Sequence, residues 1–217
     1  MKTVTFDTFF PEVMPSVFGC PEIVALNAVR NTVIDFCTET WFWQHTCAPI
    51  PGQAGLAEYA PDIPYNTKLL GLVDAWYDGR NLHQRDGNFL RSVFWHQNPF
   101  DVQGDPVFIY TTDTNNVKLL PFPQVASQFA GLEMLISVAP LRSATTCWDQ
   151  IYERYAECIA QGTLARLKMQ TRQPWSDPQG AAIAEAEYRR LRAEAKAWVQ
   201  RNKTRGALAV RYQGSSY

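Results

Sequence analysis

The stretch Gln173-Pro174-Trp175-Ser176-Asp177-Pro178 decides the fold, because it separates two amphipathic segments in the last third of the chain. Its two prolines interrupt any helix that reaches them. On both sides apolar residues recur at intervals of three and four, which predicts helices over 147–171 and 178–203 packed side by side. The residues of the two apolar stripes are Ile151, Tyr155, Cys158, Gly162, Ala165 and Met169, and then Ala184, Tyr188, Leu191, Ala195 and Trp198.

A third helix is predicted near the N-terminus, over 21–41. Its apolar stripe has the same spacing, and Trp41-Phe42-Trp43 directly after it indicates that the helix end is anchored in a core. Prolines and a glycine punctuate the residues before it, so residues 1–20 are predicted to be an irregular lead-in. The residues of this stripe are Leu26, Val29, Val33, Phe36 and Thr40.

Between these helices the pattern changes to that of β structure. Prolines and glycines after Cys47 exclude helix, and Leu132–Val138 alternates apolar and polar residues as a half-buried strand does. Lys68–Tyr77 followed by Asp78-Gly79 predicts a hairpin, and a second hairpin is predicted from Pro106–Thr112 and Val117–Leu120. We therefore expect a small antiparallel β domain of about five strands.

Together these elements predict an α+β fold. A helical bundle of about three long helices is formed by 21–47 and 141–203, the β domain is inserted at 48–140, and an extended C-terminal arm covers 204–217.

Charge is distributed unevenly along the chain. The net charge is −1, yet residues 183–217 contain eight basic and three acidic residues. Such asymmetry indicates either an electrostatic docking surface or a solvated helix face.

Few residues suggest chemistry. Cys20, Cys37, Cys47, Cys147 and Cys158 are widely spaced, which favours reduced, buried thiols over disulfides or zinc. His45 and Cys47 are too few for a metal site, and Cys147 has no nearby motif that supplies a base. The aspartates of the β region stand beside turn residues, so turn stabilisation explains them better than catalysis. We expect no enzyme activity, cofactor, metal, signal peptide or membrane span.

The last residues are the most promising candidate site. Basic residues lie among polar ones, and Ala207–Tyr212 alternates as a strand that could add to a partner's sheet. A frayed terminus is the plain alternative to an arm that orders on a partner. The candidate partner-binding residues are Arg201, Lys203, Arg205, Leu208, Val210, Arg211, Tyr212 and Tyr217.

An ordered set of segments carries a family resemblance. It consists of Phe10-Pro11-Glu12-Val13 with Gly19-Cys20-Pro21-Glu22, helix 25–40 ending on Trp41-Phe42-Trp43-Gln44, Pro49-Ile50-Pro51, residues 139–144 and 155–167, Pro174-Trp175-Ser176-Asp177-Pro178, and Arg205-Gly206. This set, covering about residues 9–206, resembles the head–tail adaptor (connector) proteins of tailed bacteriophages.

The resemblance implies a homo-oligomeric ring, typically a dodecamer, beneath the portal protein in the neck of the virion, assembled in the host bacterial cytoplasm. C-terminal arms of the family typically dock on the portal, which here corresponds to Arg189–Tyr217. The other face receives a downstream tail, nozzle or stopper protein, and genomic double-stranded DNA passes through the lumen without sequence-specific binding. The acidity of the remaining chain suits a channel wall that does not grip DNA.

Two other functions are compatible with parts of the sequence. A DNA-binding module would use the basic C-terminal helix and would bind duplex in a salt-sensitive way. A small hydrolase would use the aspartates of the β region and would need a pocket with perturbed carboxylates.

Overall fold

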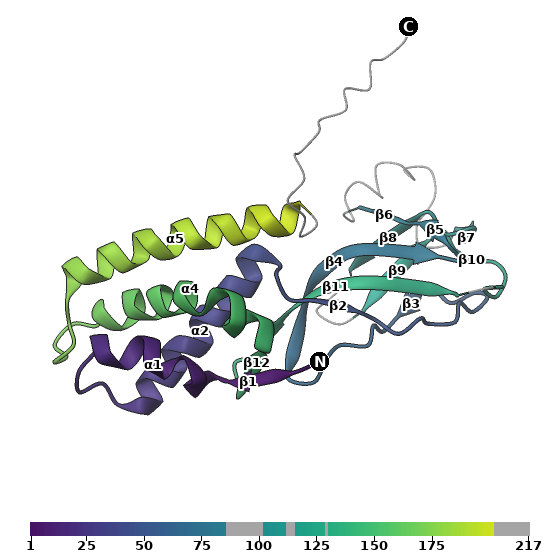
Figure 1. Ribbon diagram of the computed structural model, residues 1–217. Coiled ribbons are helices and arrows are strands. Elements are labelled where there is room, and N and C mark those ends of the chain that lie inside the picture. Colours follow the sequence, from purple (N-terminus) through teal and green to yellow (C-terminus); the bar gives the residue numbers. More distant parts are fainter. Residues whose placement is uncertain (86–101, 112–115, 129, 202–217) are drawn as a thin grey trace, which may run out of the picture.

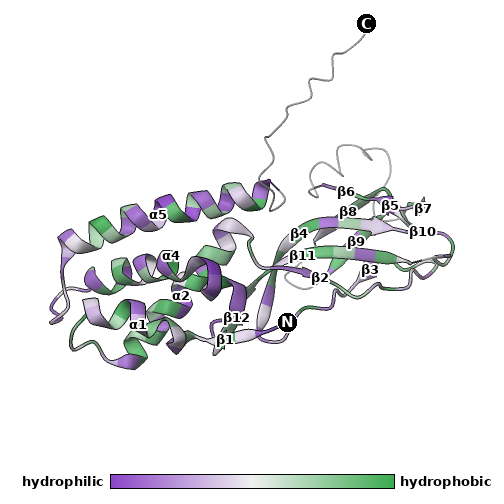
Figure 2. Ribbon diagram, in the orientation of Figure 1, coloured by the Kyte–Doolittle hydropathy of each residue, from purple (hydrophilic) through white to green (hydrophobic). Residues whose placement is uncertain are grey.

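The computed structural model describes residues 1–85, 102–111, 116–128 and 130–201. The molecule is elongated, with helices gathered at one end and strands at the other (Figure 1). Apolar and polar residues are interspersed along the helices (Figure 2), and the buried apolar residues pack together in two core clusters.

Three long helices form the helical half: α2 (Glu22–Thr40), α4 (Asp149–Lys168) and α5 (Pro178–Gln200). They lie close to the ranges that the apolar periodicity predicts. Helix α4 starts later than expected because Thr146–Trp148 forms strand β12, which pairs antiparallel with β1 (Thr3–Thr5).

Residues 1–20 are more regular than predicted. After β1 they form two 3-10 helices, η1 (Phe6–Phe9) and η2 (Met14–Ser16), around the short helix α1 (Phe10–Val13). Pro11 and Pro15 lie in the first turns of α1 and η2, where proline fits because no intrahelical donor is lost. Phe6, Phe9 and Val13 are buried. The prolines therefore start short helices here instead of marking irregular chain.

The strand half contains two four-stranded sheets, in the orders β2-β11-β4-β5 and β3-β9-β8-β6, and the two-stranded pair β10-β7. The pairs β6–β8 and β7–β10 are parallel, whereas the other pairs of the two larger sheets are antiparallel. Their bounds are β2 Gln44–Thr46, β3 Glu58–Tyr59, β4 Thr67–Tyr77, β5 Arg80–Asn81, β6 His83–Gln84, β7 Gln103–Gly104, β8 Phe108–Thr111, β9 Val117–Leu120, β10 Phe122–Pro123 and β11 Leu132–Pro140.

Both predicted hairpin pairings are confirmed. Strands β4 and β5 pair across Asp78 and Gly79, whose φ angles of 46° and 79° are those of a tight hairpin turn. Strands β8 and β9 pair antiparallel. Strand β11 alternates as predicted only in its first half, since every residue from Ile136 to Pro140 is buried.

The predicted fold class is wrong. The protein is a mixed α/β protein with several multi-stranded sheets, not a bundle of three long helices with a small β insertion. One buried apolar cluster includes Phe36 and Phe42 from the helical half together with Leu72 and Met134 from the sheets. The sequence pattern missed this because many strands are only two to four residues long, too short to show a period of two.

Candidate partner-binding surface

Helix α5 positions the surface that the sequence singles out. Asp177 caps its first turn by accepting a hydrogen bond from the backbone N–H of Gly180 at 2.9 Å, and Pro178 follows at a position that favours helix initiation. Small buried residues on the inner face let α5 pack closely on α4 and α2. A Cβ added at Gly162 of α4 would come within 2.6 Å of Thr32 and 2.8 Å of Tyr188.

A half-buried polar cluster fastens α5 to α2. The Tyr188 hydroxyl donates to Asp35 Oδ2 at 2.6 Å, and Arg192 Nη1 donates to the same oxygen at 2.8 Å. Burial, followed by the hydrogen bond to Asp35, raises the pKa of Tyr188 above its usual value. The Arg192 guanidinium also lies over the Tyr188 ring, 5.1 Å from its centroid. This cluster is structural, because its members satisfy one another between packed helices.

The remaining basic residues of α5 are matched by acids. Arg189 contacts Glu185 at 2.7 Å, and Arg190 contacts both Glu187 and Glu194. Lys196 lies 4.0 Å from Glu39 of α2. Pro178–Gln200 contains four basic and three acidic residues, whereas residues 201–217 contain four basic and no acidic residues. The charge surplus that the sequence shows in the last third therefore comes mainly from the residues after α5.

A groove lies where α5 ends. It is a hollow of about 520 Å³ between the last turn of α5, the end of α2 and β4, and a second hollow of about 350 Å³ continues it toward β8. Trp41, Leu72 and Gln84 line both hollows. Val199 and Gln200 line the first hollow, so the chain leaves α5 at the rim of the groove.

Trp41 shapes this groove through an unusual backbone conformation. It ends α2 with φ 54° and ψ 33°, in the left-handed region that a bulky residue rarely adopts. The sharp turn buries Phe42 and Trp43 in the core, as the sequence predicts, and leaves Trp41 38 % exposed. Its ring lies on Gly71 of β4, where a Cβ would approach it to 2.7 Å. The turn thus places an indole on the surface between the two halves.

Only one of the predicted partner-binding residues falls within the described part. Arg201 is exposed directly after α5, at the rim of the groove. Lys203, Arg205, Leu208, Val210, Arg211, Tyr212 and Tyr217 lie outside the described residues.

The sequence interpretation missed both Asp35 and the role of Trp41. No sequence signal links Asp35 with Tyr188, 153 positions away. The bulky Trp41 gives no hint of a left-handed backbone, since glycine and asparagine are the usual residues there.

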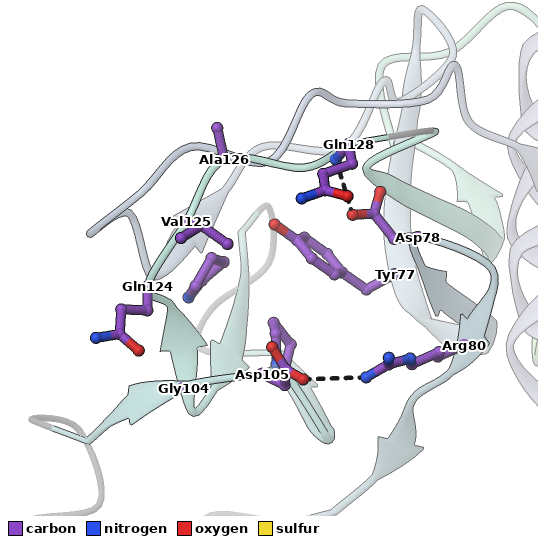
Figure 3. A pocket seen from close by; sticks show the side chains of 11 residues that line it. Tyr77, Asp78, Arg80, Gly104, Asp105, Gln124, Val125, Ala126 and Gln128 are labelled. Carbon is purple, nitrogen blue, oxygen red and sulfur yellow. Dashed lines mark hydrogen bonds and ion pairs between the residues drawn. The ribbon is translucent and has the colours of Figure 1, made fainter.

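The hydrolase alternative needs a pocket with perturbed carboxylates. A pocket of about 220 Å³ lies at the far end of the strand half (Figure 3). Asp78 accepts hydrogen bonds from the backbone N–H groups of Gln128 and Gly131, both at 3.0 Å, and Asp105 pairs with the exposed Arg80 at 3.0 Å. Burial, and then the nearby charges, raises the pKa of Tyr77 to about 12. The Tyr77 hydroxyl packs against Gly52, where a Cβ would approach it to 2.1 Å. The two aspartates thus stabilise loops, and Tyr77 contributes to packing.

Asp74 and the cysteines are also explained by hydrogen bonding and burial. Asp74 accepts a hydrogen bond from Asn81 at 3.0 Å, while Asp86, Asp101 and Asp113 lie outside the described residues. All five cysteines are buried and unpaired, as predicted. Burial raises the pKa of Cys147 and of Cys158 to about 12, so neither forms a thiolate nucleophile near neutral pH.

Two features are absent from the described ranges, a cluster of metal ligands and a long apolar helix. No three His, Cys, Asp or Glu side chains gather there in a way that would hold a metal ion. None of the helices described is long and apolar enough to cross a membrane.

Comparison with protein-family models and with curated proteins gives no match.

Proposed function

We propose that this protein is a structural head–tail adaptor of a tailed bacteriophage. It forms a ring under the portal, joins the portal vertex to the tail, and lets DNA pass through the lumen. Its portal-binding surface consists of the end of α5, Arg201, the arm that follows, and the groove around Trp41.

The observation that carries this proposal is where the surplus of basic residues lies. The basic residues of α5 are matched by Glu185, Glu187, Glu194, Asp35 and Glu39, whereas residues 201–217 contain four basic residues and no acid. This basic stretch begins where α5 ends, and α5 ends beside a groove with an exposed indole. Basic and aromatic side chains are characteristic of protein interfaces.

The same charge pairing argues against a DNA-binding module built on α5. Duplex binding depends on lysines and arginines that neutralise phosphates and release counterions. Arg189, Arg190 and Arg192 would have to leave their acidic partners first. We expect the free protein to show no salt-sensitive retention of duplex DNA in a filter assay.

The test is co-sedimentation with the portal ring encoded by the same genome. Three proteins are compared: the full chain, a deletion of residues 207–217, and the variant Arg189→Gln/Arg190→Gln as a matched charge control on α5. The deletion is expected to abolish co-sedimentation, while the α5 variant binds as the full chain does. Undiminished binding of the deletion variant would refute the role of the arm.

A further inference from the structure

The turn between η2 and α2 holds an aromatic residue out in solvent. Phe18 is 91 % exposed, although Val17 and Cys20 on either side of it are 1 % and 5 % exposed. The turn is fixed by backbone hydrogen bonds from Val17 N–H to Met14 O at 3.2 Å and from Cys20 N–H to Val17 O at 3.1 Å. Gly19 adopts φ 79°. Because the flanking residues are anchored, binding through Phe18 costs little ordering entropy.

A hollow of about 620 Å³ between α4 and α5 is large enough to receive an aromatic ring such as that of Phe18. The apolar part of its lining consists of small or flexible residues, among them Ala165 and Met169 from α4, and Ala182 and Ala186 from α5. Met169 is 64 % exposed and can adapt to an inserted ring. We call this hollow the α4–α5 groove.

The two features lie on different sides of the helical half. The connection between α1 and α2 runs along the edge opposite to α5, with α4 between them (Figure 1). A surface that meets a different surface of an identical copy gives a head-to-tail contact, which propagates into a ring or a filament.

Charge favours the same pairing. Glu12 and Glu22 lie near Phe18 in the sequence, and both are exposed. The α4–α5 groove is lined by three basic and two acidic residues: Arg166, Arg189, Arg192, Asp35 and Glu185. Of the three arginines, Arg166 is the most loosely paired, at 3.9 Å from Asp35. Opposite charges at the rim would orient one copy on the next.

We propose that Phe18 of one copy inserts into the α4–α5 groove of the next copy and so joins copies head to tail. This contact rests on the proposed function, since it supplies the subunit interface of the adaptor ring. One aromatic anchor gives a weak contact, so free copies are expected to associate only at high concentration.

Disulfide trapping at high protein concentration tests the contact. The variant Ser16→Cys/Ala186→Cys keeps Phe18 and places thiols beside it on the turn and in the groove. Ser16→Cys/Ala193→Cys is the matched control, because Ala193 is exposed on α5 outside the groove. Mild oxidation is expected to give a ladder of covalently joined copies with the first variant. The control should stop at dimers linked through the two turns.

A mixture of the single variants Ser16→Cys and Ala186→Cys should give a dimer that contains one copy of each. Absence of the ladder, or an equal ladder in both double variants, would overturn the inference. Portal co-sedimentation of the same variants separates the two proposals. Portal binding without the ladder rejects only the subunit contact, whereas a ladder without portal binding rejects only the adaptor function.

Discussion

Helix α5 and the residues that follow it are both basic in sequence, but only α5 also contains acidic residues. In α5 each arginine and the lysine lie near an acid on the same helix or on α2. From Arg201 to Tyr217 the sequence offers no acid at all. The pairing in α5 also depends on which residues the fold brings together, since Asp35 and Glu39 lie on α2. Helix α5 thus belongs to the helical half, and the residues after it are the ones that we propose to bind the partner.

The strongest test of α5 as a stabilising element is Trp198→Asp. The Trp198 ring lies 6.1 Å from the Phe42 ring and 4.9 Å from the Arg154 guanidinium. Loss of a large aromatic from a core costs about 3–5 kcal/mol, and the new carboxylate adds to this. Urea unfolding should show that the variant has lost most of its free energy of unfolding. Ala193→Asp, at an exposed position of the same helix, is the control and should stay folded.

Asp35→Ala breaks the cluster that links α5 to α2. It removes the acceptor of Tyr188, which is 3 % exposed, and of Arg192. An unsatisfied buried donor costs about 1–3 kcal/mol, so we expect about 2 kcal/mol of lost stability in urea unfolding. In a Tyr188→Phe background the same substitution should cost less. An equal cost in both backgrounds would show that the hydrogen bond contributes nothing.

Gly162→Ala tests how closely α4 packs against α2 and α5. Alanine has the higher helix propensity, which alone would raise stability by about 1 kcal/mol. The added methyl would approach Thr32 and Tyr188 to less than 3 Å, however. Overpacking typically costs about 1–3 kcal/mol, so we expect a net loss. A gain in thermal stability would mean that the helices are less tightly packed than described.

The smallest effect on stability is expected from deleting residues 207–217. Among the described residues the core clusters extend as far as Val199, so we expect these clusters to stay intact. The urea midpoint should stay within error of the full chain, while portal binding is lost. A marked loss of stability would place these residues in the fold and weaken the contrast with α5.

The sequence predicted the helices well because each has a long, regular apolar stripe. It predicted the hairpin at Asp78 and Gly79 because a turn with positive φ has a recognisable residue pair. It failed on the fold class, since β2, β5 and β6 are too short to show a pattern and their pairing depends on distant partners. For the candidate site, the charge surplus was visible, but the pairing of Tyr188 and Arg192 with Asp35 was not. Nor could the groove be predicted, because it depends on the left-handed turn at Trp41.

Electron cryomicroscopy of the full chain mixed with the portal ring from the same genome tests the central claim most directly. The account predicts a collar of added density on the portal, with the C-terminal end of α5 and the Trp41 groove facing the portal. A bare portal, or a collar whose strand half faces the portal, would contradict it.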